Sequence, residues 1–249
     1  MVKTINVGLI GFGNIGTGVV RALNENSKLI MSRLSCPIKI ARIADIDITR
    51  QRPVKYDKNI LTDDTMSVVK DPSIDIIIEL IGGTKIAKTV VETALRYKKH
   101  VVTANKALLA HFGADLFALA RENEVSLLFE SSVGAGIPII RSLAYSYSAD
   151  RINTIRGILN GTTNYILTNM EEQGRDFQDV LKEAQEHGYA EPDPTFDVEG
   201  FDTAHKLCIL ASMAFGQDIR SDSVYVNGIT QVQKDDLVYA RELGYIVKL

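Results

Sequence analysis

Short apolar runs alternate with amphipathic segments through the first half of the chain. Runs of Ile, Val and Leu predict buried parallel strands, because a sheet covered on both faces has apolar side chains at consecutive positions. The predicted strands are Ile5–Ile10, Lys39–Ala44, Ile74–Leu80, His100–Ala104 and Ser126–Glu130, and the predicted helices are Ile15–Glu25, Ala87–Tyr97 and Gly113–Asn123. This alternation is typical of an α/β fold with a Rossmann-type parallel sheet.

The pattern changes at Val133–Pro138, where three small residues and a proline interrupt the alternation. We therefore place a domain junction here, with residues 1–132 in the first domain and 133–249 in the second. In the second domain, Thr154–Leu159 is predicted to be a strand, and the segment 191–200, rich in proline and acidic residues, is predicted to be irregular. The predicted helices are Thr163–Gln173, Phe177–Glu186 and Asp202–Phe215, which makes this domain α+β.

Composition narrows the classes of partner. The chain has 249 residues, 45% of them hydrophobic and 24% charged, with a net charge of −3. Because no basic or acidic block stands out, nucleic acid and anionic membranes are poor candidates as partners. The pattern also lacks a signal peptide and an apolar run of about 18 residues that could span a bilayer. Cys36 and Cys208 have neither metal-like nor redox spacing, so we expect reduced, buried thiols in a cytoplasmic protein.

A glycine-rich turn directly follows the first predicted strand and begins the first predicted helix. Its residues are Gly11, Phe12, Gly13, Asn14, Ile15 and Gly16. In dinucleotide-binding proteins the first glycine of such a turn allows a tight bend, the second lets the backbone approach a pyrophosphate, and the third allows the helix to pack closely on the strand. The helix N-terminus then offers N–H groups to the phosphates. We predict that NAD or NADP binds here; the alternative is a purely structural turn.

Residues after the second predicted strand bear on the choice between the two cofactors. Asp45 could accept hydrogen bonds from the ribose 2′-hydroxyl of NAD, or it could cap a turn. Arg42, Arg50 and Arg52 lie close to it in sequence and could instead bind the 2′-phosphate of NADP. The residues alone leave both cofactors open.

Two further segments follow predicted strands at the carboxyl edge of the sheet, where open α/β sheets bind their ligands. Gly83 and Thr84 lie after one strand, where the backbone can approach nicotinamide or ribose; the alternative is a simple turn. Lys106 lies after another strand and is a candidate functional lysine, although it could be an ordinary surface residue. Asn105 before it is expected to cap the next helix.

Asp202 and Lys206 are four residues apart and therefore share one face of the last predicted helix. A solvated ion pair is the simplest explanation of that spacing. However, Ile209 and Leu210 fall on the same face, so Lys206 lies among apolar residues and needs a partner or a cleft. His205 falls off this face and is predicted to be structural.

Lysines and carboxylates together suit hydride transfer on a small polar substrate. Reduction of a carbonyl leaves an alkoxide that must be protonated, and a positioned lysine can donate that proton and take it back in the reverse reaction. A substrate with an amino and a carboxyl group also needs carboxylates and cations around it. The candidates are Glu191, Asp197, Asp202, Lys106 and Lys206.

Several segments resemble homoserine dehydrogenases over essentially the whole chain. The matching segments are GFGNIG, IGGT, TANKALL, ESSVGAGIP, ILNGTTNYIL and EPDPTFDVEGFDTAHKL, in the order that the family has them. The resemblance implies reversible NAD(P)-dependent reduction of aspartate 4-semialdehyde to homoserine, in the branch toward threonine and methionine. It also implies a homodimer formed through the substrate domain.

The resemblance implies roles for particular residues. Lys206 would be the proton donor, Glu191 and Asp202 would bind substrate, Lys106 would lie at nicotinamide and substrate, and Gly188 would line the cofactor side. It also implies a monovalent cation, usually sodium, bound by a carboxylate and backbone carbonyls. The matching positions are Glu130, Val133, Ala135 and Ile137. Without the resemblance this segment would be interpreted as a hinge.

The resemblance also has a departure. Family members extend well past Leu249, so the second domain is expected to be incomplete, and the activity and dimerisation of this 249-residue form are open. Two other hypotheses remain from the residues. One is a different Rossmann reductase with a lysine acid, such as a sugar or dihydrodipicolinate reductase, and the other is a cofactor-binding fragment without turnover.

Overall fold

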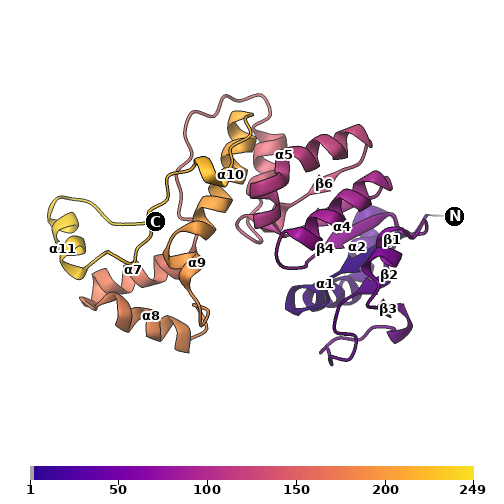
Figure 1. Ribbon diagram of the computed structural model, residues 1–249, viewed down its shortest axis with the longest axis horizontal. Helices are drawn as coiled ribbons and strands as arrows, with labels where there is room; N and C mark the ends of the chain where they lie inside the picture. The colour runs from indigo at the N-terminus through magenta and orange to yellow at the C-terminus, as the bar shows by residue number, and fades with distance from the viewer. Residues whose placement is uncertain (1–2) are drawn as a thin grey trace. The chain divides into compact units, whose positions relative to one another are not determined.

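The computed structural model describes residues 3–249 and divides the chain into two units, Met1–Ile139 and Ile140–Leu249 (Figure 1). The first unit contains the predicted glycine-rich turn, and the second contains Asp202 and Lys206. Each unit has its own core, so each is described separately.

A six-stranded sheet forms the centre of the first unit. Its strands are β1 (Ile5–Ile10), β2 (Ile38–Ala44), β3 (Leu61–Thr62), β4 (Ile76–Glu79), β5 (His100–Thr103) and β6 (Leu127–Leu128). They lie in the order β3-β2-β1-β4-β5-β6, and all neighbouring strands are parallel. This confirms the expected Rossmann-type sheet. From β1 the chain adds strands toward one edge of the sheet, and from β4 it adds them toward the other. In open α/β sheets the ligand crevice lies at the carboxyl ends of the two strands where this change occurs.

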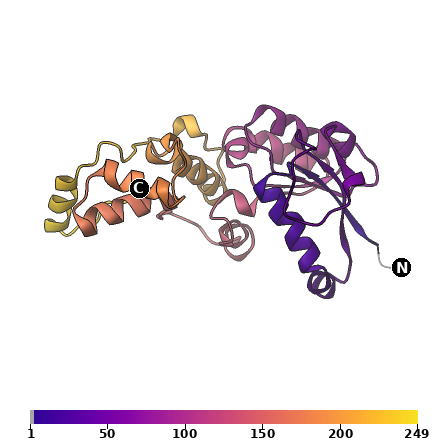
Figure 2. The ribbon, with the colours of Figure 1, turned by 90° about the horizontal axis from the view of Figure 1, so that it is seen from below.

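Helices cover both faces of this sheet. The helices α1 (Asn14–Glu25) and α2 (Ser27–Leu34) pack on one face, and α3 (Thr65–Val69), α4 (Lys85–Arg96) and α5 (Lys106–Glu122) pack on the other (Figures 1 and 2). Two short 3₁₀ turns, η1 (Lys58–Ile60) and η2 (Glu130–Ser132), complete the unit. Leu9, Ile77 and Val101 are almost completely buried, as expected for strands covered on both sides.

The helix boundaries differ from the predicted ones mainly where capping decides them. The helix α5 begins at Lys106 rather than at Gly113, because the side-chain oxygen of Asn105 accepts a hydrogen bond from Leu108 N at 3.0 Å. The predicted capping role of Asn105 is therefore confirmed. The helix α2 was not predicted, and none of its residues is buried in the structure.

The second unit is built from helices around a separate core. They are α6 (Ile139–Arg141), which begins at the boundary, the π-helical turn η3 (Ser142–Ser146), α7 (Gly161–Gln173), α8 (Phe177–Glu186), α9 (Thr195–Val198), α10 (Phe201–Phe215), the 3₁₀ turn η4 (Ser221–Ser223) and α11 (Lys234–Glu242). The core includes Ile166, Leu167, Met170 and Val180, contributed by α7 and α8.

Two predictions for the second unit are wrong. Thr154–Leu159 is not a strand, although its composition favours one. A strand needs a hydrogen-bonded neighbour, and residues 140–249 contain no other strand to provide it. The segment 191–200 is not wholly irregular, because Thr195–Val198 forms α9 directly after Pro194, and proline is well tolerated at a helix start.

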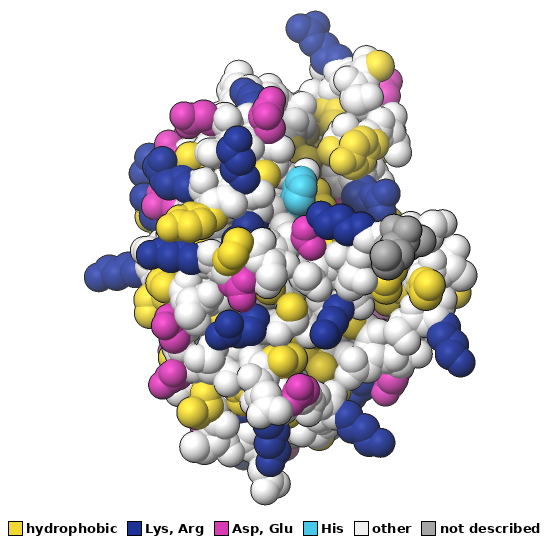
Figure 3. Space-filling view, turned by 90° about the vertical axis from the view of Figure 1, so that its right-hand side faces the viewer, with side chains coloured by type: hydrophobic (Ala, Val, Ile, Leu, Met, Phe, Trp, Pro, Cys, Tyr) yellow, Lys and Arg dark blue, Asp and Glu magenta, His cyan; other side chains and the backbone are white. Residues whose placement is uncertain are grey.

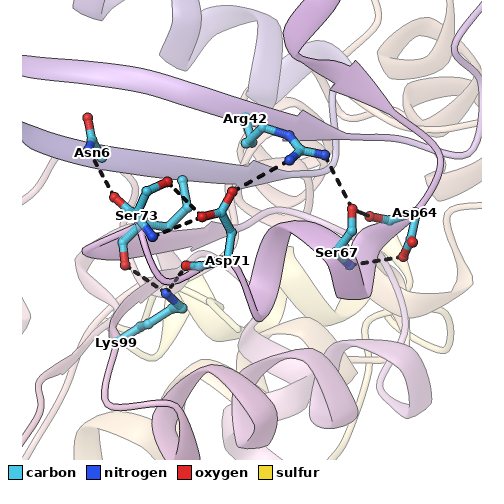
Figure 4. Close-up of polar contacts among 8 residues, drawn as sticks. Asn6, Arg42, Asp64, Ser67, Asp71, Ser73 and Lys99 are labelled. Atoms are coloured by element: carbon cyan, nitrogen blue, oxygen red, sulfur yellow. Dashed lines mark hydrogen bonds and ion pairs between the residues drawn. The ribbon is translucent and has the colours of Figure 1, made fainter.

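Polar groups tie strand ends together at the amino edge of the sheet (Figure 4). Lys99, which is 4% exposed, donates from Nζ to the carbonyl oxygens of Asp71 (2.5 Å) and Ile74 (2.7 Å). Burial lowers the pKa of Lys99, and the carboxylates of Asp71 and Asp75 oppose this effect. Arg42 forms an ion pair with Asp71 at 3.5 Å. This cluster lies at the opposite end of the strands from the predicted ligand edge.

Basic and acidic side chains are interspersed over the molecular face shown in Figure 3. Within residues 3–249, the helices are all too short or too polar to cross a bilayer.

Candidate active site

The three glycines of the turn after β1 have different physical requirements. Gly11 has φ +96°, and a Cβ there would lie 2.7 Å from Leu80 O. A Cβ on Gly16 would lie 2.2 Å from Gly11 O, so both positions need glycine for the fold itself. A Cβ on Gly13, by contrast, would meet no atom within 4 Å. The space beside Gly13 is therefore open to a ligand that approaches the backbone, which fits a pyrophosphate.

The N-terminus of α1 faces this space without a side-chain cap. Gly13 is the N-cap residue and offers no side-chain acceptor to the first N–H groups of the helix. Asn14 and Ile15 in the first turn are exposed, Ile15 to 63%. Uncapped N–H groups and the helix dipole together favour a phosphate at this position.

Asp45 and Arg52, which follow β2, stabilise the glycine-rich turn through hydrogen bonds to Phe12. Phe12 is completely buried, and its N–H donates to Asp45 Oδ2 at 2.5 Å. Arg52 donates from Nε to Phe12 O at 2.8 Å, and its guanidinium lies 4.6 Å from the centre of the Phe12 ring. Arg52 also forms an ion pair with Asp45 at 3.2 Å. The carboxylate of Asp45 thus supports the shape of the turn, in addition to any contact with ribose.

The three arginines near Asp45 have different surroundings. Arg52 is buried and donates further hydrogen bonds to the carbonyl oxygens of Arg50 and Asp47. Arg42 pairs with Asp71 near the amino edge. Arg50 is exposed, lies 3.4 Å from Asn14 Oδ1 at the start of α1, and lines a cavity with Lys55 and Lys58. Of the three, Arg50 alone lies beside the glycine turn with an exposed side chain.

Two turns meet at the carboxyl ends of β4 and β5. Asn105 Nδ2 donates to Gly83 O at 2.7 Å and to Ile81 O at 3.2 Å. Gly83 has φ +75°, and a Cβ on it would meet nothing within 4 Å. Thr84 is the N-cap residue of α4, and Lys106 is the first residue of α5. The structure therefore brings the predicted residues Gly83, Thr84 and Lys106 to one edge of the sheet.

Lys206 lies beside a carboxylate in the second unit. Its Nζ donates to Asp202 Oδ2 at 2.7 Å and to the carbonyl oxygen of Leu159 at 2.7 Å. Asp202 is 3% exposed, so this is a shielded pair rather than a solvated one. An ammonium has three N–H donors, and within residues 3–249 two of those of Lys206 are used by Asp202 and Leu159. The third N–H can therefore donate to a ligand.

Asn160 joins the two carboxylates of the site and was missed by the sequence analysis. Its Nδ2 donates to Asp197 Oδ1 at 2.7 Å and to Asp202 Oδ2 at 2.8 Å, while its Oδ1 accepts from Thr163 N at 2.8 Å. An asparagine just before a helix signals an N-cap, but not the bridge. These groups open onto a cavity of about 500 Å³. Its lining residues are Asn160, Gly161, Thr162, Tyr165, Tyr189, Asp197, Asp202 and Lys206.

Other predicted residues of the second unit lie outside this cluster. Glu191 is exposed, and the groups lining the cavity do not include it. Its backbone oxygen accepts a hydrogen bond from Gln185. Gly188 has φ +74° and follows the C-terminus of α8, where nothing lies within 4 Å of a Cβ. His205 is 8% exposed and packs edge-on against Phe196 at 5.2 Å, which fits a structural role.

The segment predicted to bind a cation has an unusual backbone. Gly134 (φ +71°) and Ala135 (φ +50°) are both left-handed, and Ile137 N donates to Gly134 O at 3.0 Å. Within residues 3–249 the carbonyl oxygens of Val133 and Ala135 accept no hydrogen bond. These two carbonyl oxygens follow Glu130 in the sequence and are of the ligand type that sodium prefers.

The parallel sheet with an open glycine turn, followed by a unit with a shielded lysine–aspartate pair, defines a dinucleotide-binding protein of the dehydrogenase class. Two family models match the chain. The model described as "Homoserine dehydrogenase, NAD binding domain" matches residues 11–130, and the model "Homoserine dehydrogenase" matches residues 138–249. The chain belongs to the homoserine dehydrogenase family.

Individual relatives agree with this assignment. The chain is 44% identical to the homoserine dehydrogenase of Bacillus subtilis over 247 residues, covering 99% of this chain and 57% of that protein. The solved structure of a homoserine dehydrogenase from Thiobacillus denitrificans matches with a TM-score of 0.92 and 44% identity, over 100% of this chain and 57% of that one. The chain therefore spans little more than half the length of these relatives.

A more distant solved structure carries a cofactor. It is a hyperthermophilic archaeal homoserine dehydrogenase in complex with NADPH, with a TM-score of 0.78 and 25% identity, over 93% of this chain and 75% of that one.

Proposed function

We propose that the protein interconverts aspartate 4-semialdehyde and homoserine with NAD(P), in the branch toward threonine and methionine. The observation that carries the proposal is the Lys206 ammonium, held by Asp202 and by the Leu159 carbonyl beside a cavity. Family membership supports the substrate, and the cavity offers both the cation and the carboxylates that an amino-acid aldehyde needs.

The reaction adds a hydride to the aldehyde carbon and a proton to its oxygen. When bound, the nicotinamide supplies the hydride. Lys206 donates the proton to the developing alkoxide, and in the reverse direction neutral Lys206 removes it from the hydroxyl. Asp202 and Leu159 O fix the position of Nζ, so that its remaining N–H is directed to the ligand.

The proposed substrate ligands supply the opposite charges. Asp197 and Asp202, joined by Asn160, and the exposed Glu191 bind the amino group of the substrate. Lys106, at the start of α5, contributes a positive charge at the nicotinamide and substrate.

The proposed cofactor residues belong to the first unit, except Gly188, which belongs to the second. The turn Gly11–Gly16 receives the pyrophosphate, and Gly83 and Thr84 contact the nicotinamide half. Either cofactor fits: Asp45 lies where a ribose hydroxyl is recognised, and the exposed Arg50 suits a 2′-phosphate. The NADPH complex of the archaeal relative supports the second possibility.

Three further features complete the proposal. Sodium binds to Glu130 and to the carbonyl oxygens of Val133, Ala135 and Ile137. The full-length protein is a homodimer, and it is located in the cytoplasm.

Oxidation of homoserine and of two other reduced compounds by the purified protein tests this function. Homoserine, a sugar alcohol and a tetrahydrodipicolinate-type substrate are each supplied with NAD or NADP, and formation of the reduced nicotinamide is followed by absorbance. We expect oxidation of homoserine alone. Oxidation of one of the other substrates instead of homoserine would assign the chain to another class of Rossmann reductase, and cofactor binding without any turnover would make it a binding fragment.

A further inference from the structure

A carboxylate is completely buried at the ligand edge of the sheet. Glu79 is the last residue of β4 and is 0% exposed. Within residues 3–249 it forms no ion pair with a lysine, arginine or histidine. A buried carboxylate without a cation is costly unless its oxygens accept hydrogen bonds.

Both carboxylate oxygens accept hydrogen bonds from residues at this edge. Oε1 accepts from the backbone N–H of Ile81 at 2.8 Å, and Oε2 accepts from Thr103 Oγ1 at 2.6 Å. Thr103 Oγ1 in turn accepts from Asn105 N at 3.0 Å. Since Asn105 also bonds to Gly83 O, a closed set of hydrogen bonds connects the turn after β4 with the turn after β5.

Burial opposes the negative charge in this position. Desolvation raises the pKa of Glu79, and the hydrogen bonds from Thr103 and Ile81, together with the nearby Asn105 side chain, only partly oppose that effect. The ionised form of Glu79 is therefore less favourable here than in water. What the carboxylate provides in this position is its two hydrogen bonds, one to each turn.

We propose that Glu79 is a positioning residue for the nicotinamide half of NAD(P), because its two oxygens fix the turn 81–84 and the turn 103–106 relative to each other. These turns carry Gly83, Thr84 and Lys106, which the proposed function assigns to cofactor and substrate. The inference rests on that function. Glu79 itself is fully buried, so it would act through these turns and not by touching the ligand.

The chemistry of the side chain makes the proposal testable with an isostere. Two donors, Ile81 N–H and Thr103 O–H, meet two acceptor oxygens of Glu79. Glutamine has an NH2 group in place of one carboxylate oxygen, so Glu79→Gln preserves the volume and removes the charge but leaves either Ile81 N–H or Thr103 O–H without its acceptor. Thr103→Val removes the hydroxyl that donates to Glu79 Oε2, whereas Thr103→Ser retains a hydroxyl there.

Binding of NADPH and NADH to the whole chain is measured by titration of nicotinamide fluorescence, together with the midpoint of thermal unfolding. We expect Glu79→Gln and Thr103→Val to weaken binding of the preferred cofactor by about fivefold or more, the loss of one hydrogen bond. Thr103→Ser should bind like the wild type. The unfolding midpoint of Glu79→Gln should stay near that of the wild type, because removal of the buried charge offsets the lost hydrogen bond. Without cofactor, amide exchange in residues 81–84 should be faster in Glu79→Gln.

Lys99→Met serves as a matched control, since it removes a buried charged side chain from the opposite edge of the same sheet (Figure 4). It should lower the unfolding midpoint and leave cofactor affinity unchanged. Wild-type affinity in either Glu79→Gln or Thr103→Val would overturn the positioning role, as would a Glu79→Gln protein whose weaker binding is matched by a lower unfolding midpoint. Failure of the wild type to bind either cofactor would instead overturn the proposed function.

Discussion

At the residue scale, small differences in surroundings separate structural from functional positions. The three glycines of the turn after β1 look equivalent in the sequence, yet only Gly13 has open space where a side chain would lie. Gly11 and Gly16 are required by contacts within the protein. At Gly13 no such contact exists, and we propose that a ligand approaching the backbone requires glycine there.

Replacement of Gly13 tests this distinction. Gly13→Val should leave the unfolding midpoint near that of the wild type, because the added atoms enter open space, but should weaken NAD(P)H binding by at least about tenfold. Gly18→Ala is the control, since Gly18 is exposed on α1 and its Cβ would also meet nothing within 4 Å. It should bind cofactor normally and gain about 0.5–1 kcal/mol of stability. Fluorescence titration with wild-type affinity for Gly13→Val would show that no phosphate lies there.

Residue types and spacing predicted Lys206 and Asp202 as a pair but not Asn160 or Glu79. The first pair is visible because a helix brings positions four apart onto one face. Asn160 approaches Asp202 across 42 positions in sequence, and Glu79 approaches Thr103 across 24. Such long-range hydrogen bonds depend on how the elements pack. The remaining signal for Glu79 was an acidic residue inside an otherwise apolar strand.

At the element scale, an apolar run formed a strand where another strand of the same unit could pair with it. The strands β1 and β2 agree with the runs that predicted them, because each pairs with a parallel neighbour. Thr154–Leu159 has a similar composition but forms no strand, since its unit lacks a partner strand within the described residues. The helix α8 matches its prediction at both ends, and its buried Phe177, Val180 and Ala184 provide the apolar face on which that prediction rested.

Asp75, at the amino edge of the sheet, should make the unfolding free energy of the protein depend on pH in the acid range. Hydrogen bonds from Lys3 and from the Asn6 backbone lower the pKa of Asp75 below its usual 3.8, although burial opposes them. A carboxyl whose pKa is lower in the folded state adds stability above its unfolded pKa, and this is lost as pH falls through the folded value. Chemical denaturation of wild type and Asp75→Asn should therefore give a difference in unfolding free energy that is present at pH 7 and shrinks below about pH 4. A constant difference down to pH 2 would mean that Asp75 does not have a lowered pKa.

At the scale of the whole molecule, the two units are proposed to contribute separate parts of one reaction. The first carries the open glycine turn, and the second carries Lys206, the proposed proton donor. A substitution that impairs cofactor binding in the first unit should therefore leave the Lys206 site of the second unit unchanged, and the converse should also hold. Gly13→Val should therefore weaken cofactor binding while the Lys206 cluster remains, and a change at Lys206 should stop turnover while cofactor still binds.

The rate of homoserine oxidation by Lys206→Ala, at saturating cofactor and substrate, tests the central claim most directly. Lys182→Ala, an exposed lysine on α8, is the matched control. We expect Lys206→Ala to bind NAD(P)H with wild-type affinity and to lose turnover by about 10²-fold or more, the usual contribution of a general acid–base group. Lys182→Ala should react like the wild type. Homoserine oxidation by Lys206→Ala at the wild-type rate would contradict the assignment of Lys206 as the proton donor.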